Sequence, residues 1–124
     1  MASNPDPSGV VIYHNPSCST SRKVLALIRE RGIEPKIIEY LKTPPTPQEL
    51  VALAERMGVP LAGLLRKKAA AYAARGLGGE GVTEQQILDA IAADPVLIER
   101  PVVVTPLGAR LGRPPEAVLA ILPR

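Results

Sequence analysis

The chain has 124 residues, 46% of them hydrophobic, and a net charge of +3, which favours one globular domain over a disordered or fibrous protein. The single cysteine, Cys18, excludes an internal disulfide framework, and the single histidine leaves too few ligands for a Cys/His zinc site. The positive charge is mild and three tyrosines are the only aromatic residues, so nucleic-acid binding is not indicated.

The N-terminal residues carry no sign of a secretory signal. Residues 1–8 are polar and contain two prolines, and we expect a flexible tail there. No apolar run in the chain approaches the roughly 18 residues that a transmembrane helix needs. We therefore expect a cytoplasmic, monomeric protein without a membrane partner, folded as one domain over residues 9–124.

The first half of the chain alternates strand, helix and strand. Apolar residues at positions 10–13 predict a buried strand, and residues 36–41 predict a second one. Between them a helix is expected from Ser19, with N-cap candidates at positions 19–21 and a stop at Gly32. Because a helix connects the two strands, we expect them to be parallel with a right-handed crossover.

The second half begins with helices and ends with a hairpin. Capping boxes at Thr46 and Thr83 each place a Glu or Gln three residues after the threonine and predict two helix starts. Shorter helices are expected within residues 61–77, and four glycines predict a loop over residues 76–81. Residues 101–105 and 109–111 then predict two strands joined by a turn, followed by a last helix over residues 114–122.

This order of elements points to one fold class. A β-α-β unit is followed by helices and then by a β-β-α unit, with no internal repeat. The sequence therefore predicts a thioredoxin-like α/β fold, in which a mixed sheet of about four strands carries an inserted helical segment between its halves.

The chemistry is concentrated in the loop between the first strand and the first helix. Cys18 lies at the expected helix start among serines and a threonine, where free backbone N–H groups favour a thiolate. Most free cysteines are small buried apolar residues, but these polar neighbours favour a reactive nucleophile. The spacing from Cys18 to Ser21 is C-x-x-S, a dithiol redox motif that lacks its second cysteine.

A histidine and three arginines are further candidates for this site. His14 is either an ordinary loop histidine or an imidazolium that lowers the pKa of Cys18. Arg66, Arg100 and Arg113 each stand at the end of an apolar element. Each arginine alone is more often a solvated surface charge. If they converge on one edge of the sheet, a thiolate ringed by guanidinium groups would bind a small tetrahedral oxyanion.

At these residues the chain resembles the glutaredoxin-coupled ArsC-type arsenate reductases. The similarity runs over residues 10–123, with the motifs in the same order and at the same spacing. The matching motifs are YHNPSCSTSR from position 13, LLRK from position 64, ERPVVVTPLG from position 99 and RLGRP from position 110. Together they make chance a poor explanation.

The resemblance implies roles for the candidate residues. Cys18 matches the nucleophile that attacks arsenate. The arginines that bind the oxyanion match Arg66, Arg100 and Arg113. The histidine near the thiolate matches His14.

It implies further local features as well. Ser21 matches a hydroxyl that hydrogen-bonds the sulfur, and the peptide bond between Arg100 and Pro101 matches a cis peptide. Gly112 stands where some relatives carry a second, non-catalytic cysteine, and we expect this departure to leave the chemistry unharmed.

The resemblance also implies the source of the electrons. Glutathione would be the co-substrate and glutaredoxin the protein partner, with no metal and no bound cofactor. The single cysteine agrees with this, because a chain with one thiol cannot complete a two-electron reduction internally. It also argues against the three-cysteine, thioredoxin-coupled arsenate reductases.

Three alternatives share the fold. A glutathione-dependent thiol reductase would keep Cys18 but would not need all three arginines. An Spx-type regulator that contacts RNA polymerase resembles C-x-x-C at its redox switch, and Ser21 removes that switch here. A monothiol glutaredoxin with an iron–sulfur cluster would carry Gly-Phe between its Cys and Ser, where this chain has Ser19 and Thr20.

Overall fold

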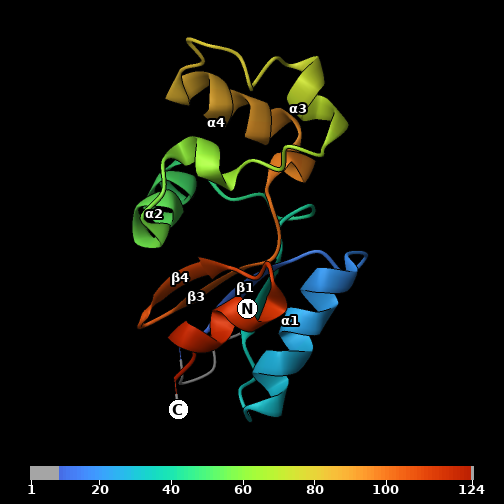
Figure 1. The fold of residues 1–124 in the computed structure, drawn as a ribbon, viewed down its shortest axis with the longest axis vertical. Coiled ribbons are helices and arrows are strands. Elements are labelled where there is room, and N and C mark those ends of the chain that lie inside the picture. The colour runs from blue at the N-terminus through green and yellow to red at the C-terminus, as the bar shows by residue number, and fades with distance from the viewer. Residues whose placement is uncertain (1–8, 124) are drawn as a thin grey trace. The chain divides into compact units, whose positions relative to one another are not determined.

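The structure is a computed structural model that describes residues 9–123. The expected tail over residues 1–8 lies outside the described residues. The chain forms two compact units (Figure 1). The first comprises the chain up to Thr43 together with the chain from Arg100 onward, and the second comprises Pro44–Glu99.

A four-stranded sheet forms the first unit. Its strands are β1 (Val11–His14), β2 (Lys36–Glu39), β3 (Val102–Thr105) and β4 (Gly108–Leu111), in the spatial order β2-β1-β3-β4. β1 and β2 are parallel, whereas β3 is antiparallel to both β1 and β4. The predicted parallel β-α-β unit and the C-terminal hairpin are therefore confirmed, as is the thioredoxin-like mixed sheet.

Two helices pack with this sheet. α1 (Ser19–Glu30) contacts the C-terminal helix η3 (Pro115–Ile121), which Figure 1 shows in red near α1. Val24 and Ile28 of α1 are fully buried and join Ile12 and Val103 of the sheet in one apolar cluster. Full burial of such side chains stabilises the fold by about 1.5–3 kcal/mol each. The last helix lies where it was predicted, but it is a 3-10 helix.

Hydrogen bonds hold the turn between β3 and β4 and link it to the C-terminal helix. β3 and β4 are joined by a two-residue turn, because Thr105 pairs with Gly108. The hydroxyl of Thr105 donates to the carbonyl of Ile121 over 2.5 Å and accepts from the N–H of Leu107 over 3.0 Å. The peptide bond between Arg100 and Pro101 is cis, as the resemblance implied, and a second cis bond precedes Pro114.

The second unit is helical. Its elements are α2 (Pro47–Met57), η1 (Leu61–Leu64), α3 (Ala70–Ala74), α4 (Glu84–Ala93) and η2 (Pro95–Leu97). Both predicted capping boxes are present, with reciprocal bonds between Thr46 and Glu49 and between Thr83 and Gln86. The helix expected from residue 61 ends early, at Leu64, because the next residue, Leu65, forms an isolated β-bridge with Ile98. Among the described residues, no helix is both long and apolar enough to cross a membrane.

Candidate active site

Cys18 is the N-cap of α1. Its backbone is extended, with φ −93° and ψ 120°, and its carbonyl accepts the N–H of Arg22 over 3.0 Å. Its own N–H donates to the carbonyl of Asn15 over 3.0 Å and closes the loop. The sequence placed the N-cap at positions 19–21, one to three residues too late. No side chain caps this helix, so its first N–H groups are available to the cysteine sulfur.

The surroundings of Cys18 favour its thiolate. Partial burial raises the pKa of the thiol, but four groups outweigh this effect. The backbone N–H groups of Ser21 and Thr20 and the side chain of Arg100 donate to the sulfur, and the charge of Arg113 adds to them. The pKa of Cys18 is therefore lowered from its ordinary value of 9.0.

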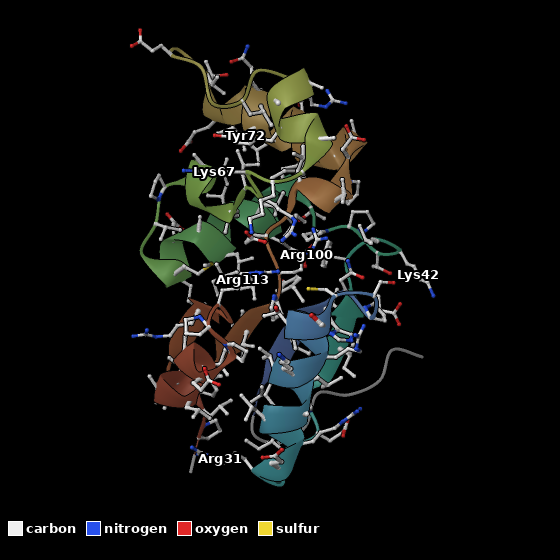
Figure 2. The ribbon with its side chains drawn as sticks, turned by 45° about the vertical axis from the view of Figure 1, so that its right-hand side comes forward. Arg31, Lys42, Lys67, Tyr72, Arg100 and Arg113 are labelled. Carbon is white, nitrogen blue, oxygen red and sulfur yellow. The ribbon has the colours of Figure 1, made fainter. Side chains whose placement is uncertain are left out.

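Arg113 connects the sulfur of Cys18 to the backbone of Arg100. Its Nη2 donates to Sγ of Cys18 over 3.5 Å, and its Nε donates to the carbonyl of Arg100 over 2.8 Å. Figure 2 labels both arginines. Arg100 lies just before β3 and Arg113 just after β4, so the antiparallel pairing of these strands brings the two residues together.

His14 is buried and contacts Ser21. Its Nδ1 lies 2.6 Å from Oγ of Ser21, and the N–H of Asn15 donates to the same oxygen over 3.1 Å. Burial is the largest influence on His14 and lowers its pKa from 6.5; Glu39 opposes this effect, while Arg29 and Arg22 reinforce it. The lowered pKa favours the neutral imidazole at pH 7, which disfavours the interpretation of His14 as an imidazolium acting on Cys18.

Two hydrogen-bond patterns satisfy the contact between His14 and Ser21. If Nδ1 carries the proton, the serine oxygen accepts from both His14 and Asn15, and its own hydrogen is left for another acceptor. If Nε2 carries the proton, the serine hydroxyl donates to Nδ1 instead. The tautomer of His14 thus decides whether the hydroxyl of Ser21 accepts from Nδ1 or donates to it, and it is the backbone N–H of Ser21 that acts on the sulfur.

Arg66 belongs to the second unit and is held there by Glu99. Its Nη1 donates to the carboxylate of Glu99 over 2.7 Å, and its backbone N–H donates to the carbonyl of Leu97 over 2.7 Å. The side chains of Arg66 and Glu99 are only 21% and 20% exposed, so this ion pair is partly shielded from water. Of the six predicted site residues, five lie in the first unit and Arg66 lies in the second.

Sequence reasoning overlooked two residues around the cysteine loop. Asn15 is buried, and its side-chain oxygen accepts the N–H of Ser17 over 3.0 Å, so it shapes the turn before Cys18. The Asn-Pro dipeptide at positions 15 and 16 was a usable turn signal. Glu99, the partner of Arg66, could not be identified, because the two residues are 33 positions apart.

The site residues suit an anion rather than a cation. Across residues 9–123, no three His, Cys, Asp or Glu side chains are grouped so that they could hold a metal ion. The groups around Cys18 are instead N–H donors and guanidinium ions. Such donors stabilise a thiolate and bind the oxygens of a tetrahedral oxyanion.

Comparison with known proteins shows the family of this chain. The sequence model of the ArsC family matches residues 13–121. This chain belongs to the ArsC family. It is 52% identical over 116 residues to the arsenate reductase of Escherichia coli (strain K12), covering 94% of this chain and 82% of that protein. It is 50% identical over 114 residues to the arsenate reductase of Rhizobium meliloti (strain 1021), covering 92% and 81%.

Solved structures of the family share the fold. The structure of the arsenate reductase from Vibrio cholerae superposes with a TM-score of 0.88 at 46% sequence identity. The match covers 91% of this chain and 97% of that one.

Proposed function

We propose that this ArsC-family protein is an arsenate reductase in which the thiolate of Cys18 attacks arsenate. The observation that carries this proposal is the hydrogen bond from Arg113 to the sulfur at the uncapped start of α1. Attack on arsenate requires two features, a thiolate nucleophile and a cationic binding site for the oxyanion. Curated relatives at about 50% identity are named arsenate reductases, which supports the choice of substrate.

The first step would form a sulfur–arsenic bond. The Cys18 thiolate donates an electron pair to As(V), and one arsenate oxygen leaves as water after it is protonated. The negative charges of arsenate and thiolate repel each other. Guanidinium groups beside the sulfur reduce this repulsion and stabilise the charge on the oxygens as the bond forms.

Reduction would then use thiols from outside the chain. The protein has one cysteine, so it cannot form a disulfide within itself. We propose glutathione as co-substrate and glutaredoxin as the protein that completes the cycle. In the balanced reaction, arsenate and two thiols give arsenite, one disulfide and water. Arsenic gains the two electrons that the thiol sulfurs lose.

Arg66, Arg100 and Arg113 are proposed to bind the oxygens of arsenate. Arg100 and Arg113 are supported by their contacts with Cys18. Arg66 is supported by the resemblance alone, since its contacts with Glu99 and Leu97 lie within the second unit. Because an arginine has five N–H donors, Arg66 can keep one bond to Glu99 and offer others to an oxyanion.

We propose that both units work as one ArsC domain in a monomer. The family match over residues 13–121 spans both units, which supports one functional domain. Cys18, Arg100 and Arg113 lie in the same compact unit, so the proposed attack on arsenate is built within one copy of the chain.

The test is arsenate-dependent NADPH oxidation coupled through glutathione, glutaredoxin and glutathione reductase. We expect turnover with the natural protein and none with Cys18→Ser, which has nearly the same shape but a far weaker nucleophile. The Tyr72→Phe variant is the control, because it changes a residue outside the proposed site and should keep the turnover of the natural protein. Absence of arsenate turnover by the folded natural protein would overturn the proposal, and mixed disulfides of glutathione would then be the substrates to try.

A further inference from the structure

A groove of about 610 Å³ runs along one face of α1, beside the loop that carries Cys18. Its lining belongs entirely to the first unit. This volume suits a small organic ligand, because ligand pockets in proteins commonly enclose roughly 300–1,000 Å³. The lining includes Pro16 from the cysteine loop and, from α1, Arg22, Leu25, Ala26, Arg29 and Glu30.

Arg22 brings its charge to the end of the groove that is nearest to Cys18. Arg22 follows the cysteine by four residues, yet its Nη1 donates back to the carbonyl of Pro16, two residues before the cysteine, over 2.8 Å. The N–H of Cys18 donates to the carbonyl of Asn15 in the same loop. Because a guanidinium group has five N–H donors, the bond to Pro16 leaves others for a ligand.

The middle of the groove is apolar. Leu25 and Ala26 follow Arg22 by three and four residues, so they lie on the same face of the helix. Leu25 is half-buried and Ala26 is exposed. This part of the groove can therefore contact the methylene groups of a ligand that Arg22 holds by a charged group.

The far end of the groove carries both signs of charge. Arg29 and Glu30 lie seven and eight residues after Arg22, which is about 10 Å farther along the helix axis. Arg29 donates from Nε and Nη2 to the carboxylate of Glu34, over 2.9 Å each, and its Nη1 is left for a ligand. A ligand head group with both a carboxylate and an ammonium group would fit this end.

We propose that this groove binds glutathione, the thiol co-substrate. At neutral pH glutathione has two carboxylates and one ammonium group, and the groove lining includes two guanidinium groups and one carboxylate. The short glycine arm beside the thiol carries one carboxylate to Arg22. The longer, γ-linked glutamyl arm carries the other charges toward Arg29 and Glu30. The choice of glutathione rests on the proposed function, whereas the groove and its charges do not.

The groove and the oxyanion arginines approach Cys18 from different sides of β1. In the sheet, β1 pairs with β2 on one side and with β3 on the other. Arg100 precedes β3 and Arg113 follows β4, so both come from the β3 side. The groove is tied to the β2 side, because Arg29 pairs with Glu34 just before β2. Glutathione in the groove would therefore reach the sulfur without displacing the arginines that hold arsenate.

The test is the reaction of Cys18 with glutathione disulfide, which needs no arsenate. The Cys18 thiolate attacks one sulfur of the disulfide, the original S–S bond breaks, and one glutathione thiolate leaves. The Cys18 sulfur is oxidised and the released sulfur is reduced. Mass spectrometry of the intact chain follows this step, because Cys18 is the only cysteine. The uncharged bis(2-hydroxyethyl) disulfide is the reference, and the ratio of the two rates corrects for changes in the reactivity of the thiolate itself.

Arg22→Ala should lower this ratio about fivefold, the upper end of the range for an exposed ion pair. Ala26→Glu should lower it by a similar factor, because it places a carboxylate in the groove. Position 26 is exposed and glutamate favours helices, so this variant should fold. Lys23→Ala is the matched control, since it removes the same charge from a neighbouring exposed position outside the groove lining. Its ratio should equal that of the natural protein.

S-methylglutathione measures binding without a reaction at the sulfur. It carries the same three charges as glutathione, but its sulfur is blocked. We expect it to slow the reaction of the natural protein with glutathione disulfide in a saturable way. The concentration that gives half of this effect should be about fivefold higher for Arg22→Ala.

Several results would overturn the inference. Equal slowing of both disulfides in Arg22→Ala would mean that Arg22 acts on the cysteine loop and not on glutathione. An equal loss in Lys23→Ala would mean a general attraction between charges. An unchanged ratio in Ala26→Glu would exclude glutathione from the groove, and a loss of glutaredoxin-dependent turnover in that variant would then identify the protein partner as its occupant.

The outcome for the groove is independent of the outcome for arsenate. If the natural protein does not reduce arsenate, the proposed function fails. The ratio of the two disulfide rates still decides whether the groove recognises glutathione.

Discussion

Arg113 donates from Nη2 to Sγ of Cys18 over 3.5 Å, although the two residues are 95 positions apart in the chain. The same guanidinium donates from Nε to the carbonyl of Arg100, so its orientation is fixed by the backbone that enters β3. Arginine can do both at once because its donors form a planar fork, whereas lysine offers a single ammonium group. The contact therefore links the pairing of β3 and β4 to the state of the cysteine.

Arg113→Lys should raise both the pKa of Cys18 and the KM for arsenate. Lysine keeps the charge but cannot hold the Arg100 carbonyl and the sulfur together. We expect KM to rise roughly 10- to 100-fold, the range that follows from loss of a hydrogen bond to a charged group. Ultraviolet titration and steady-state kinetics check the two effects.

The matched control for Arg113 is Arg110→Lys. Arg110 lies on β4, three residues before Arg113, and it is exposed. Its replacement should leave both quantities as they are in the natural protein. Equal behaviour of the two variants would mean that net charge, and not the geometry at Cys18, determines the result.

Arg66→Lys should separate substrate binding from thiolate activation. Arg66 belongs to the second unit, where it pairs with Glu99, and the groups that lower the pKa of Cys18 lie in the first. We therefore expect a higher KM for arsenate with an unchanged Cys18 pKa. The same titration and kinetics as for Arg113→Lys apply, and a normal KM in this variant would remove Arg66 from the proposed oxyanion site.

Ser21→Ala should lower the free energy of unfolding and leave the pKa of Cys18 nearly unchanged. The substitution keeps the backbone N–H that donates to the sulfur but removes the partner of His14 and of the Asn15 N–H, all in a buried place. Leaving buried polar groups unsatisfied costs about 1–3 kcal/mol. Urea unfolding measures this loss, and the exposed Ser19→Ala is its control. Equal stability of the two variants would show that the hydroxyl of Ser21 is not a structural anchor.

The burial of His14 should make stability depend on pH. Its pKa in the folded protein is below 6.5, so on acidification the unfolded chain takes up a proton before the folded one does. The stability that the neutral imidazole confers is complete above pH 6.5 and is lost as the pH falls through the folded pKa. Urea unfolding measures the free energy of unfolding of the natural protein and of His14→Gln. We expect the difference between the two to shrink as the pH falls below 6.5. Parallel curves would refute the effect.

Local signals were sufficient for most of the fold. Several elements depend only on a few neighbouring residues, and all of them are present. They are the capping boxes at Thr46 and Thr83, the strand predicted at residues 10–13 and the turn before Gly108. The β-α-β order then fixed the parallel pair, because the connecting helix allows little else.

The site was less predictable because its contacts are long-range. Arg113 reaches Cys18 across 95 positions, and Arg66 pairs with Glu99 across 33 positions. The hydrophobic periodicity of a sequence does not indicate which distant residues come into contact. The N-cap was misplaced for a related reason: the hydroxyl of Ser21, which looked available for capping, is taken by buried partners on β1 and the loop after it.

The most direct test of the account is the rate at which iodoacetamide alkylates Cys18 as a function of pH, with and without arsenate. We predict a midpoint below the ordinary thiol value of 9.0 and saturable protection by arsenate, with both effects weakened in Arg113→Ala. An ordinary midpoint together with no protection by arsenate would contradict the central claim that this loop activates a thiolate beside an oxyanion site.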